Sequence, residues 1–84
     1  MPELVTLLTI YYACAADAAV GVLTQPQRFA CNETYQQAKR LFADEPHLRV
    51  PGSVLTPEQN TVAYLKLRAW EAENAELVAE LKGR

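Results

Sequence analysis

The sequence predicts an all-α protein with three helices in one domain, residues 1–84. Apolar residues recur at helical spacing along most of the chain, and two segments begin with a threonine and a proline that cap helices. We expect an antiparallel hairpin of helices over 2–20 and 25–44, a loop over 45–55, and a long C-terminal helix over 57–82. A chain this short buries a little over ~60% of its unfolded surface, so its own core is marginal.

The first helix is unusually apolar. Pro2 and Glu3 suit its first turn, and Gly21 suits its end. Sixteen of the 20 positions from 4 to 23 are hydrophobic, and Asp17 carries the only charge. A helix that is apolar nearly all round must be covered on more than one side. The segment therefore predicts a second copy, a partner protein or a lipid as cover.

Two targeting interpretations of this segment are weak. A signal peptide has a basic start, whereas no Lys or Arg precedes Arg28. For a membrane span, the eight Leu, Ile and Val residues contribute about -4 kcal/mol to the free energy of insertion, and Asp17 near the centre of the span adds about +3 kcal/mol. We therefore expect a cytoplasmic protein with no membrane association, and a periplasmic or envelope protein is the alternative.

The second helix has a clear start. Thr24 and Gln27 have the spacing of a capping box, and Pro26 in the first turn loses no hydrogen bond. Pro46 ends the helix, because the residue before a proline avoids the helical region. The expected apolar stripe consists of Cys31, Tyr35, Ala38, and Leu41 or Phe42.

The loop that follows contains Val50-Pro51-Gly52-Ser53, which fits a type II turn with glycine where φ is positive. A short β-ribbon around it is disfavoured, since type II turns splay the strands of a hairpin.

The third helix begins with the strongest local signal, Thr56-Pro57-Glu58-Gln59, another capping box with proline in the first helical position. Two apolar lines run along it. One is a heptad seam: Asn60, Ala63, Leu67, Trp70, Asn74, Leu77 and Leu81. The other is Val62, Leu65, Ala69 and Ala72.

The seam supports two interpretations. Residues 71–82 resemble a leucine zipper in general composition, and an asparagine at an a position, here Asn74, fixes the register of a two-stranded coiled coil. Alternatively, a helix with two adjacent apolar lines packs on the hairpin of its own chain.

Cys14 and Cys31 are equidistant from the turn centred near residues 22 to 23, so they face each other across the hairpin. A disulfide would link the two helices covalently and, for a loop of this length, would stabilise the folded state by about 3 kcal/mol. Our default expectation is instead two free cysteines that pack as small hydrophobic side chains.

No pattern points to catalysis. The net charge of -2 does not favour binding to a nucleic acid duplex, and one histidine and two cysteines are too few for a usual zinc site. We expect no catalytic residues, cofactor or metal. The alternative is an enzyme with a cationic pocket built from Arg28, Arg40, Arg49, Lys66 and Arg68.

The sequence therefore predicts a small non-enzymatic interaction protein, such as an adaptor, inhibitor or regulator. It would associate with itself, as a homodimer or larger, or with another protein. The alternative is an envelope protein with a disulfide-pinned hairpin or an N-terminal anchor. The expected interface comprises Leu4, Leu7, Leu8, Tyr11, Tyr12, Leu67, Trp70, Asn74, Leu77 and Leu81.

Overall fold

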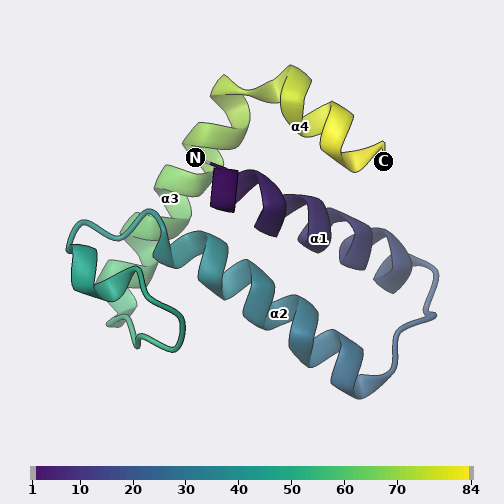
Figure 1. Ribbon diagram of the computed structural model, residues 1–84, viewed down its shortest axis with the longest axis horizontal. Coiled ribbons are helices and arrows are strands. Elements are labelled where there is room, and N and C mark those ends of the chain that lie inside the picture. The colour runs from purple at the N-terminus through teal and green to yellow at the C-terminus, as the bar shows by residue number, and fades with distance from the viewer. Residues whose placement is uncertain (1, 84) are drawn as a thin grey trace.

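The computed structural model describes residues 2–83, and those residues form helices and loops without any strand. The α-helices are α1 (Pro2–Ala19), α2 (Gln25–Arg40), α3 (Pro57–Glu73) and α4 (Ala75–Lys82), and a 3-10 helix, η1, spans Pro46–Leu48. In Figure 1, α1 and α2 lie side by side and antiparallel, α4 runs along the other side of α1, and α3 crosses the end of the hairpin where α1 begins. The all-α prediction is confirmed.

Both capping boxes form as predicted. The Thr24 amide donates to Gln27 Oε1 at 2.8 Å, and the Thr56 amide donates to Gln59 Oε1 at 2.9 Å. The amides of both glutamines donate back to the threonine hydroxyls. These bonds satisfy amides that a helix start leaves without partners, so local sequence defines the starts of α2 and α3.

The two glycine turns also form as predicted. Helix α1 ends at Ala19, and Gly21 in the turn that follows has φ of 74°, a value that L side chains rarely adopt. Gly52 has φ of 86°, and the Ser53 amide donates to the Val50 carbonyl at 3.3 Å, as in a type II turn.

Helix α2 ends at Arg40, earlier than the predicted residue 44. The Phe42 amide donates to Lys39 at 2.9 Å and the Ala43 amide to Arg40 at 3.0 Å, which tightens the last turn. The chain can turn here because Arg49 Nε donates to the Ala43 carbonyl at 2.8 Å. This contact comes from a residue beyond the helix, which helical periodicity does not reveal.

The loop is fastened to α2 by side chains. Arg40 Nε donates to the Ser53 carbonyl, and Gln37 Nε2 donates to the Arg49 carbonyl, both at 2.8 Å. These bonds hold residues 49–53 against the end of α2 and position the start of α3.

The predicted single helix over 57–82 is wrong, because the structure divides it at Asn74. Asn74 has φ of -119° and ψ of 37°, outside the helical region. Its backbone amide and its Nδ2 both donate to the Trp70 carbonyl, at 3.0 and 2.9 Å. Asparagine competes for backbone groups in this way and favours helix ends. The break turns α4 back along α1, and it interrupts the continuous heptad seam.

The core lies at one end of the hairpin. Its buried residues come from all four α-helices: Leu4, Leu8, Tyr12, Ala38, Leu67, Val78 and Leu81. Between residues 13 and 37, by contrast, no residue is buried. The far half of the hairpin therefore has little packing of its own.

The two cysteines are joined in the far half of the hairpin. Cys14 and Cys31 form a disulfide with their Cα atoms 5.8 Å apart. The predicted hairpin register is confirmed, and the expectation of two free, buried thiols is wrong. Because both residues are only half-buried, the bond connects the two helices where no buried side chains do so.

Candidate interaction surface

The residues expected at an interface lie in the core of the protein or at its edge. Leu4, Leu8, Tyr12, Leu67 and Leu81 are buried, and Leu7, Tyr11, Trp70 and Leu77 are half-buried against them. Asn74 is half-buried at the α3–α4 break. An apolar surface open to a partner must therefore come from other residues.

Such a surface follows the outward side of α3. Val62, Leu65, Ala69 and Ala72 are all exposed, with Leu65 at 59% and Val62 at 41%. We call these four residues the outer stripe. Their spacing of three, four and three residues keeps them on one face of α3, opposite Ala63 and Leu67 in the core. Helix α3 is therefore apolar on two opposite sides, and its own chain covers only one.

Sequence reasoning found both apolar lines of this helix but could not tell which one faces inward, since both have helical spacing. Side-chain size is the available signal. The line with Leu67, Trp70 and Leu81 buries more apolar area than the outer stripe would, so its burial contributes more free energy.

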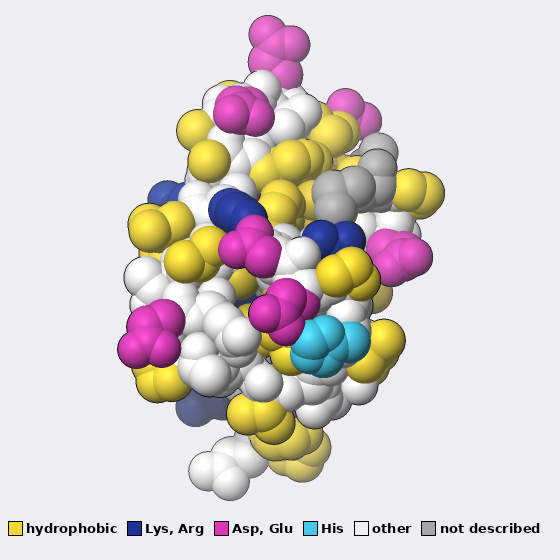
Figure 2. Space-filling model, turned by 90° about the vertical axis from the view of Figure 1, so that its left-hand side faces the viewer, with side chains coloured by type: hydrophobic (Ala, Val, Ile, Leu, Met, Phe, Trp, Pro, Cys, Tyr) yellow, Lys and Arg dark blue, Asp and Glu magenta, His cyan; other side chains and the backbone are white. Residues whose placement is uncertain are grey.

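Two charged side chains beside the outer stripe are paired within the protomer. Lys66 forms an ion pair with Asp44, and Arg68 Nη1 lies 3.1 Å from Glu71 Oε1. Figure 2 views the molecule from the α3 side, where apolar side chains lie exposed among scattered acidic and basic ones. Among the described residues on this face, acidic and basic side chains are interspersed.

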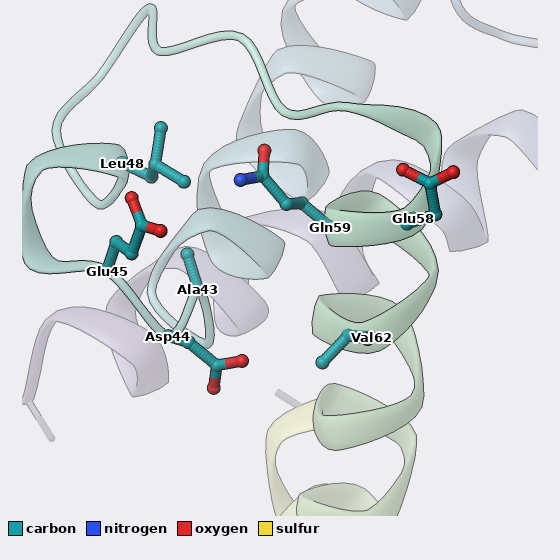
Figure 3. Close-up of a pocket in the computed structure, with 7 residues that line it drawn as sticks. All are labelled: Ala43, Asp44, Glu45, Leu48, Glu58, Gln59 and Val62. Carbon is teal, nitrogen blue, oxygen red and sulfur yellow. The ribbon is translucent and has the colours of Figure 1, made fainter.

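A hollow of about 180 Å³ adjoins the lower end of the stripe. Val62 of α3 shares it with Ala43 and Leu48 from the loop. Figure 3 shows Gln59 reaching into this space, whereas the Glu58 carboxylate points away from it. Asp44, which pairs with Lys66, and Glu45, whose carboxylate lies 3.4 Å from His47 Nε2, complete the lining. The hollow extends the apolar surface but contains no nucleophile beside a base.

The most strongly perturbed group lies on the other side of α3. The Tyr12 hydroxyl donates a hydrogen bond to Glu71 Oε2. The other carboxylate oxygen of Glu71 accepts a hydrogen bond from Arg68 Nη1. Burial, together with this hydrogen bond, raises the pKa of Tyr12 well above its ordinary value. Tyr12 thus remains a protonated donor at neutral pH, and the cluster connects α1 to α3 as a structural contact.

The cations considered for an anion pocket do not converge. Arg40 and Arg49 hold the loop, Lys66 and Arg68 are in separate ion pairs, and Arg28 lies on the far half of the hairpin. Among residues 2–83, no group of three or more His, Cys, Asp or Glu side chains could hold a metal ion.

Other exposed apolar side chains lie on α1, on α2 and in the loops. Val20 and Val22 lie in the turn between α1 and α2, Phe29 lies on α2, and Val54 in the loop is 87% exposed. On α1, Ile10 at 49%, Ala13 and Ala16 are also exposed at helical spacing, but Ile10 alone of these three is larger than alanine, whereas the outer stripe has both Val62 and Leu65. In the part of the chain that the structure describes, no helix has both the length and the hydropathy of a membrane span.

Comparison of the chain with known protein families, with curated protein sequences and with solved structures found no match.

Proposed function

We propose that this protein is a small non-enzymatic interaction protein, an adaptor, inhibitor or regulator, which binds through the outer stripe of α3. The observation that carries the proposal is the two-sided apolar character of α3. One side packs into the core through Ala63 and Leu67, while Leu65 on the opposite side is 59% exposed. Covering that side in a complex would remove apolar surface from water, the main favourable term in protein association.

The overall dimensions support the same proposal. The accessible surface is 5493 Å², whereas a compact monomer of 9.4 kDa is expected to expose about 5,000 Å². The radius of gyration is 13.0 Å, against about 12 Å for a compact chain of 84 residues. The protomer is thus more open than its size requires, as expected of a chain that completes its packing with a partner.

A comparison of surface variants tests the proposal. Wild-type protein, Leu65→Glu and Val54→Glu are used as baits in their native host, and the retained proteins, including further copies of the chain, are quantified by mass spectrometry. We expect Leu65→Glu to lose specific partners that wild type retains. Val54→Glu, which places the same charge at an exposed apolar site away from the stripe, should retain them. If no retained protein depends on Leu65, the outer stripe is not the binding surface.

A second candidate, an envelope protein with a disulfide-pinned hairpin, is favoured by the Cys14–Cys31 bond. Disulfides persist in oxidising compartments and are rare in the cytosol, so the bond favours an extracytoplasmic location over the cytoplasmic one expected from the sequence. Fractionation of native cells, with thiols alkylated before lysis, tests this candidate. Protein found in the cytosol with both cysteines alkylated would reject it.

A further inference from the structure

We infer that the outer stripe binds the same stripe on a second copy of this chain, with the two α3 helices antiparallel. The inference rests on the proposed function, because it names the occupant of that surface. It follows from the distribution of side-chain sizes along the stripe.

The stripe has a large half and a small half. Val62 and Leu65 lie toward the start of α3, and Ala69 and Ala72 lie toward its end. An antiparallel pairing about a two-fold axis near residue 67 places Leu65 against Ala69 of the second copy and Val62 against Ala72 of the second copy. Each layer then combines one large and one small side chain, which favours close packing of the two helices.

A parallel pairing is less complementary. It would place Leu65 against Leu65 and Ala69 against Ala69, so that one layer is overfilled and another leaves a gap. Gaps forfeit dispersion contacts, and overfilled layers force side chains out of their preferred rotamers. The order of residues along the stripe therefore favours the antiparallel arrangement.

The neighbouring charges permit this approach. Lys66 and Arg68 flank the middle of the stripe, where the two-fold axis would bring each close to its own counterpart. Both are paired within the protomer, with Asp44 and Glu71. At the middle of the stripe, the two copies would thus bring together cations that each have a carboxylate partner in their own protomer.

The size of the surface sets the expected strength. Helix α3 has 17 residues, or about 25 Å of helix, and the stripe contributes four side chains from each copy. Such a contact falls below the roughly 1,200 Å² of a standard stable interface. We therefore expect a dimer that forms at micromolar to high micromolar concentration and dissociates on dilution.

A charge complementation experiment tests the pairing and its direction. Sedimentation velocity of the full chain over a concentration series measures dimerisation of Leu65→Glu, of Ala69→Lys, and of their equimolar mixture. Each variant alone should dimerise at least about tenfold more weakly than wild type, because it leaves a charge unpaired in the seam. The mixture should recover most of that loss, since the antiparallel register brings the new carboxylate against the new ammonium group.

Two controls make the result specific. A mixture of Leu65→Glu with Ala72→Lys should not recover, because residue 72 lies opposite Val62 and not opposite Leu65. Circular dichroism should show unchanged helix content for all three variants, as expected for substitutions at exposed sites.

The outcomes separate this inference from the proposed function. If wild type remains at 9.4 kDa at several hundred micromolar, a second copy is not the occupant, although Leu65-dependent binding of another protein would still support the function. If both single variants weaken the dimer and neither mixture recovers, the antiparallel register is wrong while the stripe remains the interface. If Leu65→Glu dimerises as strongly as wild type, the dimer forms elsewhere.

Discussion

Tyr12 joins three helices through one side chain. It lies on α1, donates to Glu71 of α3, and has Lys82 Nζ of α4 at 5.2 Å from its ring centroid. Replacing it by phenylalanine keeps the ring and removes the hydroxyl, so Glu71 retains only Arg68. We expect Tyr12→Phe to lower the free energy of unfolding by about 1–2 kcal/mol, since hydrogen bonds to charged groups are stronger than neutral ones. Urea denaturation measures this change, with Tyr64→Phe as the control, because Tyr64 is 41% exposed. Equal stability of Tyr12→Phe and wild type would contradict it.

The same hydroxyl predicts a pH dependence. Burial is the main cause that raises the pKa of Tyr12 and of Tyr35 above 10.0, and hydrogen bonding to Glu71 adds to it for Tyr12. A pKa that is higher in the folded state means that folding favours the protonated hydroxyl. This contribution is therefore fully present below pH 10, and it is lost as the pH rises further. We expect the free energy of unfolding to fall above pH 10, and to fall less steeply in Tyr12→Phe. A parallel decline in the two proteins would exclude a role for Tyr12.

Asn74 determines where the third predicted helix breaks. Its side chain and backbone both donate to the Trp70 carbonyl, and α4 starts at the next residue. Asn74→Leu removes the side-chain donor and favours a continuous helix, which would draw α4 away from α1. We expect a loss of about 1 kcal/mol in unfolding free energy and faster amide exchange in residues 75–82. Unchanged exchange in α4 would mean that packing alone maintains the break.

At the scale of elements, the hairpin depends on its disulfide. No residue from 13 to 37 is buried, and Cys14–Cys31 is the covalent connection within that region. A bond that closes a loop of this length contributes about 3 kcal/mol. We expect the Cys14→Ser/Cys31→Ser double variant to lose about that much stability, with exchange in residues 13–30 increasing more than in the core.

Reduction of the wild-type protein provides the matched control for this variant, because it opens the same bond without changing the sequence. The reduced wild-type protein and the double variant should have the same free energy of unfolding and the same amide exchange rates. If exchange in residues 13–30 is as slow without the bond as with it, local helix formation holds the far half of the hairpin, and the disulfide does not.

Elements that depend on residues close together in the sequence could be predicted, whereas features that depend on residues far apart in the sequence could not. The starts of α2 and α3 were predicted from Thr24 and Thr56, because a capping box is complete within four residues. The hairpin register was predicted from the turn centred near residues 22 to 23. The break at Asn74 and the early end of α2 could not be predicted, since the first accompanies the packing of α4 on α1 and the second involves Arg49, nine residues farther along.

The binding surface was harder to predict than the fold. Both lines of α3 have the spacing of an apolar seam, so periodicity left open whether Leu67 and Trp70 face a second copy or the hairpin of their own chain, and the expected interface included both residues. The structure places these residues inside the protomer, where they bury more apolar area, and leaves the outer stripe exposed. The inference from an excess of apolar surface still applies, but to the outer stripe of α3 and to the exposed end of α1 instead of to the buried Leu4 and Leu8.

At the scale of the whole molecule, self-association would make stability depend on concentration. A partner that binds only the folded state adds stability by mass action, about 2.7 kcal/mol at a concentration 100 times the dissociation constant. For a domain of this size, each kcal/mol raises the melting temperature by about 4–8 °C. We therefore expect the melting temperature of wild type to rise by several degrees between low and high micromolar concentration. Leu65→Glu should melt at one temperature throughout this range, because it lacks the dimer while its core is intact. A melting temperature of wild type that is independent of concentration would show that the protomer gains nothing from a second copy, whatever other partner covers α3.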